Sequence, residues 1–382
     1  MDSVYLDFNA TTPIHAEIAH QMSGWLLAGE PSNPSSLHSH GREARRFLEQ
    51  ARQRLASYLH VDPAELHFTS GGTESNNLAM FGLAPTDSPL HVGATEHPSI
   101  LEPAKHQWQM GRPGGLLDVD ACGRIQDFEV EEGALYSIQW VNNETGITQD
   151  IPDLATRIHD GGGWLHIDGA QGFFRLDQTI AELGADSASI TAHKSFGPIG
   201  VGALWVRSGL LVEPVIRGGP QEKKIRPGTE NLPSIRGLGL LAEIAQTQSP
   251  SRLWDLDQLR ESRAALIAQL ESIPDTRIVE HRPQDWPGCV HIGFLGIHAE
   301  TLLVRLDMAG ISASSGSACS SGAREPSHVL EAMGFEIDWI RGSVRLSMGP
   351  TSSVDLMTGV GVQLARIVEE LRQRDLQSPP TA

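Results

Sequence analysis

Between residues 65 and 207 the sequence alternates short apolar runs with amphipathic or glycine-rich stretches. The apolar runs predict β-strands, and the amphipathic segments 77–83 and 153–159 predict helices between them. This alternation is typical of an α/β fold, with a mostly parallel central sheet covered by helices. Such sheets bind ligands beyond the carboxyl ends of their strands. The predicted strands cover residues 66–69, 135–141, 164–168, 188–191 and 203–206.

A second pattern begins near residue 250, after a linker that contains serine and proline. Apolar side chains then recur at helical spacing, and shorter apolar runs follow, which together predict a smaller α+β domain. The predicted helices cover residues 256–270, 301–308 and 354–371, and the predicted strands cover 290–295 and 344–348. We therefore predict a large domain at 13–250 and a small domain made of 1–12 and 251–382.

Composition narrows the classes of function. The net charge of −18 argues against direct nucleic-acid binding, because phosphate contacts need clustered basic side chains. No apolar run approaches the ~20 residues of a membrane helix, and the first residues lack the pattern of a secretory signal. The cysteines Cys122, Cys289 and Cys319 are far apart and lack metal-ligand spacing, so we expect neither disulfides nor a metal site. We predict a cytoplasmic protein that acts on small molecules.

A lysine and an aspartate follow two of the predicted strands. Lys194 precedes a glycine-rich turn and has Thr191 and His193 beside it, which suggests a crowded site for an anionic ligand. A lysine that forms a Schiff base with a cofactor aldehyde needs this partial desolvation. Asp168, taken alone, is most simply a helix N-cap. Together with Lys194 it is better interpreted as the carboxylate that pairs with the ring nitrogen of pyridoxal phosphate.

A third element at a strand end is suited to phosphate. Residues 66–77 run from a predicted strand through Gly71 and Gly72 to Thr73 and a helix start. Exposed backbone N–H groups and the positive end of a helix favour an anion there. Thr73 is alternatively a plain N-cap. Three such elements along one parallel sheet indicate a cofactor site more strongly than any one of them.

Cys319 lies in a run of small residues, from 312 to 328. A cysteine in such a run is usually a buried core thiol or an unimportant exposed one. So many serines and glycines favour a mobile surface loop, where a thiol is reactive if its surroundings favour the thiolate. We therefore predict that the stretch from about 314 to 323 is mobile and presents Cys319 to other molecules.

Together these segments resemble the cysteine desulfurases, within the class-V aminotransferase group of fold-type-I pyridoxal-phosphate enzymes. The resemblance implies the fold-type-I architecture and a homodimer. It also implies that sulfur is removed from L-cysteine to give L-alanine and a persulfide on Cys319, for transfer to an acceptor protein of unknown identity. It rests on residues 5–13, 33–38, 71–73, 95–98, 141–146, 192–194, 226–231 and 312–330.

The same resemblance implies a role for individual residues. The catalytic residues would be Lys194, Cys319 and His97. The cofactor would be bound by Gly72, Thr73, Asn143, Asp168, Gln171, Thr191, His193, Lys194 and, from the neighbouring subunit, Thr229. The substrate would be bound by Asn33, Asn143 and Arg345, whose guanidinium suits a carboxylate.

The sequence departs from the family pattern at Ser195, Ile199 and Pro227, and residues 218–226 are more basic and less glycine-rich than usual. None of these departures removes a predicted catalytic group. Two alternatives stay open. A selenocysteine lyase or another class-V enzyme would keep Lys194 and Asp168 without needing Cys319 for sulfur transfer, and an inactive scaffold would only bind partner proteins.

Overall fold

The computed structural model describes residues 3–29, 33–85, 87–316 and 326–377. Its central sheet has seven strands, of which only β8 runs antiparallel to the other six. The mostly parallel sheet confirms the predicted α/β architecture. From edge to edge the strands are β2 (Leu66–Thr69), β8 (Gly202–Val206), β7 (Ser187–Thr191), β6 (Trp164–Asp168), β5 (Leu135–Gln139), β3 (Leu90–Gly93) and β4 (Gly114–Leu117).

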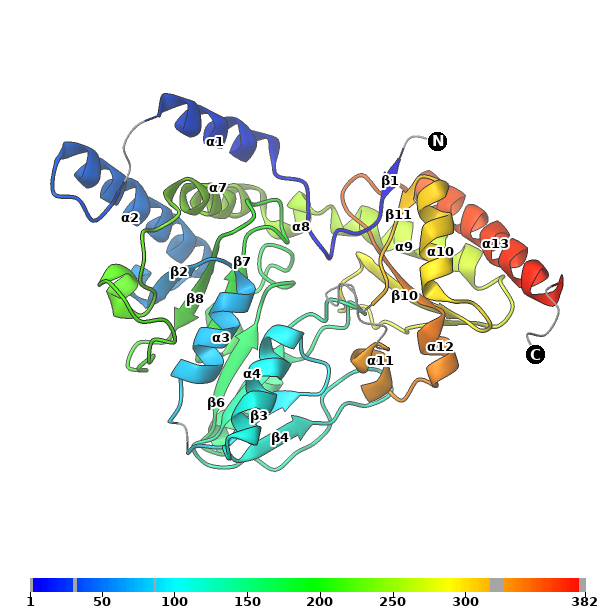
Figure 1. Cartoon of the computed structure of the whole chain (residues 1–382), viewed down its shortest axis with the longest axis horizontal. Coiled ribbons are helices and arrows are strands. Elements are labelled where there is room, and N and C mark those ends of the chain that lie inside the picture. Colours follow the sequence, from blue (N-terminus) through cyan, green and yellow to red (C-terminus); the bar gives the residue numbers. More distant parts are fainter. Residues whose placement is uncertain (1–2, 30–32, 86, 317–325, 378–382) are drawn as a thin grey trace.

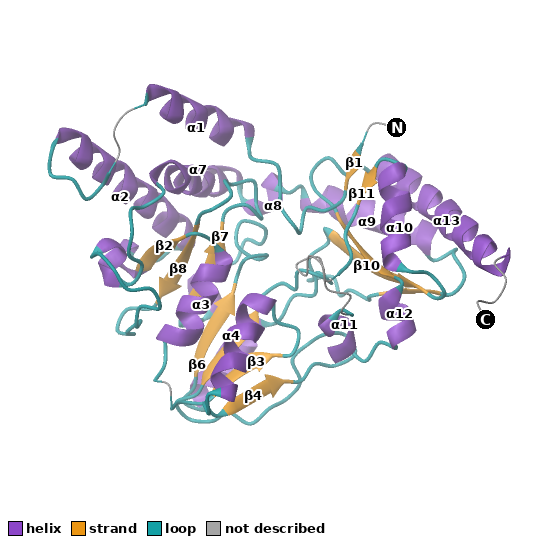
Figure 2. Cartoon of the chain, in the orientation of Figure 1, coloured by secondary structure: helices purple, strands orange, loops and turns teal. Residues whose placement is uncertain are grey.

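Helices pack on both faces of this sheet (Figures 1 and 2). The adjacent β5 residues Leu135 and Tyr136 belong to different apolar clusters, because side chains alternate across a strand. Leu135 packs with α3 and α4, and Tyr136 belongs to the cluster that includes α2, α5 and α7. These helices are α2 (Ser39–Leu59), α3 (Gly72–Gly82), α4 (Pro98–Gln109), α5 (Ile151–Asp160) and α7 (Leu232–Gln248); α1 (Ala16–Ala28) packs on α7.

The remaining elements gather around a three-stranded antiparallel sheet with the order β12-β10-β9 (right side of Figure 1). Helices α9 and α13 pack closely on one another, as expected for long amphipathic segments. The elements are α8 (Pro250–Leu253), α9 (Leu256–Leu270), β9 (Thr276–Ile278), β10 (Cys289–Phe294), α10 (Ala299–Met308), β11 (Ile311–Ser312), α11 (His328–Ala332), α12 (Ile337–Arg341), β12 (Ser343–Ser347) and α13 (Val354–Gln377).

The start of the chain connects the two sheets. Strand β1 (Val4–Tyr5) pairs in parallel with β11. Beyond it, the N–H of Ser347 donates to the carbonyl of Leu6 (2.8 Å), and the N–H of Thr12 donates to the carbonyl of His193 (3.0 Å). The predicted division into two domains stays a prediction. Among the described helices, none is long and apolar enough to cross a membrane.

Candidate active site

A cavity of about 270 Å³ opens where β5, β6 and β7 end. Most of the predicted site residues meet in it, although they come from segments far apart in the sequence. It is lined by Asn9, Ala10, Gly72, Thr73, Asn76, His97, Ser99, Gln139, Asn143, Asp168, Ala170, Gln171, Thr191, His193, Lys194 and Arg345.

The ammonium group of Lys194 lies in this cavity, held by main-chain oxygens of the N-terminal segment. Its Nζ donates to the carbonyls of Asn9 (2.8 Å) and Ala10 (2.6 Å). The next residue, Ser195, is buried, and Gly197 closes the following turn with a hydrogen bond to Ala192. The side chain of Lys194 and the turn that follows it are therefore both held in place, as a residue with a chemical role requires.

Beneath Lys194 lies a fully buried arginine, Arg175. Its Nη2 donates to the carbonyl of Lys194 (2.9 Å), and its Nη1 donates to Oδ1 of Asn9 (2.8 Å). The guanidinium also lies over the rings of Trp254 and Trp286, 4.6 and 5.0 Å from their centroids. Burial lowers the pKa of Arg175 to about 9, so it is still charged at neutral pH. It orients both the lysine and the segment that the lysine contacts.

A hydrogen-bonded chain joins Asp168 to His97. Oδ2 of Asp168 accepts from Nδ2 of Asn76 (2.9 Å), which also donates to Oγ of Ser99 (2.8 Å), and that hydroxyl contacts Nδ1 of His97 (2.8 Å). Oδ1 of Asp168 accepts from the N–H of Ala170 (3.0 Å). These two donors to Asp168 are neutral, so its buried charge is left for a cationic ligand group. Asp168 does not cap a helix.

His97 caps the N-terminus of α4 through a hydrogen bond from the N–H of Ser99 to its Nδ1 (3.1 Å). Because Nδ1 accepts this bond, the neutral ring carries its hydrogen on Nε2. Burial is the main cause that lowers the pKa of His97, and the charge of Lys194 adds to it, against the opposing effect of Asp168. His97 is therefore a neutral imidazole at the cavity wall.

The N-terminus of α3 forms an open end of the cavity. The helix begins at Gly72, and its N-cap is Gly71 (φ 151°), not Thr73; no side chain of the described residues caps it. Beside it the buried hydroxyl of Thr191 has no hydrogen-bond partner among the described atoms. Unpaired N–H groups at a helix start, together with a hydroxyl, suit an anion such as phosphate.

Arg345 is buried on β12, where the local sequence alone would suggest a surface residue. Its Nη1 donates to the carbonyl of Asn143 (3.0 Å), and its Nη2 pairs with Oδ1 of Asp7 (2.8 Å). Its main chain exchanges hydrogen bonds with Ser314. The guanidinium therefore faces the cavity from the side of the smaller sheet.

Cys319 lies outside the described residues, as does most of the predicted mobile stretch 314–323. The residues on either side of the gap meet at one buried carboxylate, Glu144. Oγ of Ser327 donates to Oε2 of Glu144 (2.6 Å), and a Cβ added to Gly316 would lie 2.4 Å from the same oxygen. Burial raises the pKa of Glu144. Both flanks thus contact Glu144, the residue that follows Asn143 in the sequence.

Two predicted site residues do not line the cavity of the single chain that the structure describes. Asn33 is exposed, and its Oδ1 accepts from the N–H of Ser35 (2.9 Å). Thr229 is exposed in the segment before α7. Their predicted roles stay predictions.

The sequence of this chain is similar to those of known proteins. The family model for class-V aminotransferases matches residues 4–355. The chain is also 36% identical, over 380 residues, to a protein of Dictyoglomus turgidum called cysteine desulfurase IscS, a match that covers 97% of this chain and 95% of the relative. The chain belongs to the cysteine desulfurase family. Members of this family, within the class-V aminotransferases, are pyridoxal-phosphate enzymes.

Solved structures agree with this family. A NifS-like protein superposes with a TM-score of 0.87 at 29% identity, covering 96% of this chain and 100% of the other. A structure described as SspA in complex with cysteine has a TM-score of 0.77 at 28% identity, covering 91% of this chain and 99% of the other. The predicted family and fold type are confirmed.

The chemistry of the cavity suits the family's cofactor. Lys194 provides an amine, Asp168 provides a buried carboxylate, and the open start of α3 with Thr191 provides hydrogen-bond donors for a phosphate. Oε1 of Gln171 is also buried without a hydrogen-bond partner among the described atoms. Buried polar atoms without partners are rare in native proteins, and a bound ligand would satisfy these two.

Sequence reasoning missed several buried groups of this site. Arg175 and Glu144 are described above, and Glu96 is a third. Its carboxylate accepts from the N–H of Gln139, and both burial and the nearby Asp168 raise its pKa. A signal for Glu96 and Glu144 exists in hindsight, because each lies in one of the segments that carry the resemblance, 95–98 and 141–146.

Buried histidines around the site predict a steep acid dependence of stability. Burial lowers the pKa of His166 to about 3 and those of His193 and His291 to about 4, from an ordinary value of 6.5. The unfolded chain therefore takes up protons below pH 6.5 that the folded chain does not, so the free energy of unfolding falls from pH 6.5 towards 4. Urea denaturation at several pH values measures this free energy of unfolding. The variant His166→Gln should show a smaller decrease of the free energy of unfolding between pH 6.5 and 4. A free energy that is constant over this range contradicts the assignment.

Proposed function

We propose that this chain is a cysteine desulfurase that binds pyridoxal phosphate on Lys194, removes sulfur from L-cysteine and carries it on Cys319. The observation that supports this most is the cavity, where Lys194, Asp168, His97 and the open start of α3 converge in a chain of this family. The cofactor, when bound, withdraws electrons from the substrate carbon attached to nitrogen.

Each group has a place in holding the cofactor. Lys194 is one of four lysines in the sequence and lines the cavity, so we assign it the bond to the cofactor aldehyde. Asp168 would keep a proton on the ring nitrogen, because its carboxylate is buried and the two groups that donate hydrogen bonds to it are neutral. His97 would stack on the ring, and Gln171 and Asn143 would face the phenolic oxygen. Gly72, Thr73, Thr191 and His193 would bind the phosphate.

The substrate would be oriented by its carboxylate. Nη1 and Nη2 of Arg345 can bind two carboxylate oxygens, and the contacts with Asp7 and the carbonyl of Asn143 hold the guanidinium in place. Asn143 would assist, and Asn33 is proposed as a further contact. Nζ of Lys194 would take the proton from the substrate carbon, and the neutral ring of His97 would accept or return a proton.

In the sulfur step, the carbon–sulfur bond of the substrate breaks and a sulfur–sulfur bond to Cys319 forms. The carbon gains a proton, so cysteine and an enzyme thiol yield alanine and an enzyme persulfide with no external oxidant or reductant. An acceptor protein of unknown identity would then take the sulfur. We place this reaction in the cytoplasm, where thiols remain reduced.

Replacing Lys194 by alanine should remove the cofactor's visible absorbance and lower turnover by about a thousandfold, because no amine would remain in the cavity. Lys105→Ala is the matched control, since Lys105 is exposed and pairs with Glu102. Absorption spectra and alanine release measure the effect. A Lys194→Ala protein that keeps both its colour and its activity would refute the assignment.

Replacing Cys319 by serine should preserve the cofactor spectrum and its response to cysteine, but lower sulfide release in the presence of a thiol reductant by about a hundredfold. Cys289→Ser should stay near wild type, because Cys289 is fully buried and burial raises its pKa to about 11. Cys122→Ser is the second control. If Cys289→Ser were the inactive variant, the wrong sulfur carrier would have been assigned.

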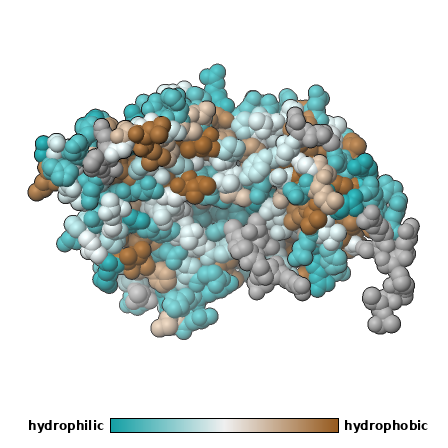
Figure 3. Space-filling view, turned by 45° about the horizontal axis from the view of Figure 1, so that its top comes forward, coloured by the Kyte–Doolittle hydropathy of each residue, from teal (hydrophilic) through white to brown (hydrophobic). Residues whose placement is uncertain are grey.

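A homodimer with shared active sites is also proposed, because Thr229 would reach the neighbour's phosphate. Leu26, Leu27 and Leu37 are 63%, 87% and 90% exposed, and Figure 3 shows apolar patches at the end of the molecule formed by α1 and α2. Mixing Lys194→Ala subunits with Thr229→Val subunits should restore part of the activity, because one of the two sites in each mixed dimer then has both residues. A fully active monomer in light scattering would disprove this arrangement.

A further inference from the structure

A left-handed turn precedes the segment that holds Thr229. Glu222, Lys223 and Lys224 have φ angles of 43°, 56° and 72°, and none of them is glycine. Left-handed backbone brings a Cβ too close to the next carbonyl, so three such residues in succession persist only where other contacts hold them. This turn is therefore held in a costly conformation by its surroundings.

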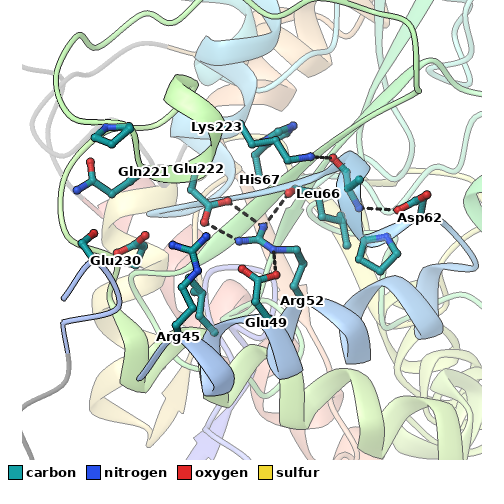
Figure 4. Close-up of a pocket in the computed structure, with 15 residues that line it drawn as sticks. Arg45, Glu49, Arg52, Asp62, Leu66, His67, Gln221, Glu222, Lys223 and Glu230 are labelled. Carbon is teal, nitrogen blue, oxygen red and sulfur yellow. Dashed lines mark hydrogen bonds and ion pairs between the residues drawn. The ribbon is translucent and has the colours of Figure 1, made fainter. Parts of the chain in front are cut away.

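The contact that holds the turn is a buried ion pair between Glu222 and Arg52 (Figure 4). The carboxylate accepts from Nη1 (2.9 Å) and Nη2 (2.7 Å) of Arg52 and from the N–H of Phe68 (2.8 Å). Nη1 of Arg52 also donates to the carbonyl of Leu66 (2.8 Å). Because β2 is an edge strand, the pair satisfies main-chain groups that have no neighbouring strand. The turn is thereby fastened to the sheet.

The turn leads within two residues to Arg226, which reaches the start of α3. Nε of Arg226 pairs with Oε1 of Glu74 (2.9 Å), and Oε2 of Glu74 accepts from the N–H of Ser70 (2.7 Å). Burial acts to raise the pKa of Glu74, but the hydrogen bonds from Ser70 and Arg226 outweigh it and the pKa is lowered. Glu74 is therefore a carboxylate in the first turn of the helix whose open end faces the cavity.

A carboxylate beside a phosphate site repels the ligand unless a cation compensates it. We infer that Arg226 is the counter-ion that lets the start of α3 bind a phosphate, and that Arg52 and Glu222 are positioning residues that place Arg226 there. This inference rests on the proposed function for the identity of the phosphate, which belongs to the cofactor. The side chains of Glu74 and Arg226 are 14% and 24% exposed, so water screens the interaction only in part.

Equilibrium binding to the cofactor-free protein tests this, with pyridoxal phosphate compared with pyridoxal. Arg226→Met should weaken binding of pyridoxal phosphate about tenfold, the size expected for one partly buried charge interaction. Pyridoxal, which has no phosphate, should bind as it does to wild type. Adding Glu74→Gln to Arg226→Met should restore the affinity, because the repelling charge is gone while the amide oxygen can still accept from Ser70.

Arg52→Met and Glu222→Gln should weaken the binding of pyridoxal phosphate in the same way and leave the binding of pyridoxal unchanged. Arg45→Met is the matched control, because Arg45 and Arg52 both line a second cavity, separate from the active-site cavity, but Arg45 is not part of the buried pair (Figure 4). Equal weakening of both ligands, or an Arg226→Met protein with unchanged affinity, would overturn the inference. The inference would also be overturned if the double variant Arg226→Met/Glu74→Gln folds, as judged by its thermal unfolding, but still binds pyridoxal phosphate more weakly than wild type does.

The outcome is separable from that of the proposed function. If wild type binds neither pyridoxal phosphate nor pyridoxal, the proposed function fails. Inorganic phosphate, measured by calorimetry on wild type and Arg226→Met, then tests the counter-ion alone. A weaker phosphate affinity in the variant supports the role of Arg226, and equal affinities refute it.

Discussion

The site depends on one buried cation, the guanidinium of Arg175. It binds the carbonyl of Lys194 and the side chain of Asn9, and it lies against Trp254 and Trp286. These groups come from the segment after β7, from the start of the chain and from the part of the chain beyond α7. A buried charge without partners is costly. Removing any one of these contacts would therefore also disturb the others that Arg175 makes. The cavity is thus formed where three distant segments meet around one charge.

Much of the fold could be predicted from the sequence, because buried parallel strands are continuous apolar runs with abrupt ends. The strands ending at Asp168 and Thr191 were identified in this way, together with the polar residues that follow them. Strands β3 and β4 were not, since each has only four residues and includes glycine. Helix α3 begins at Gly72, close to the helix start expected at Thr73 but five residues before the amphipathic segment 77–83.

The site was predictable only where residues have a recognisable chemistry or lie in a family segment. Ten of its predicted residues line the cavity, including Lys194, Asp168 and Arg345. Arg175 could not be found, because a charged residue in an ordinary sequence context is usually exposed and its burial is decided by tertiary packing. Thr229 was expected to act across a proposed dimer and Asn33 lies exposed on the surface, so the fold of one chain tests neither role.

The central claim is that one chain removes sulfur from cysteine and carries it on one thiol. A single turnover with L-cysteine and no reductant tests it directly, followed by alanine quantification and mass analysis of the cysteine-containing peptides. The account predicts one alanine for each cofactor-loaded site and the added mass of one sulfur atom on the peptide that contains Cys319. Formation of pyruvate in place of alanine, or added sulfur on the peptides of Cys122 or Cys289, would contradict it.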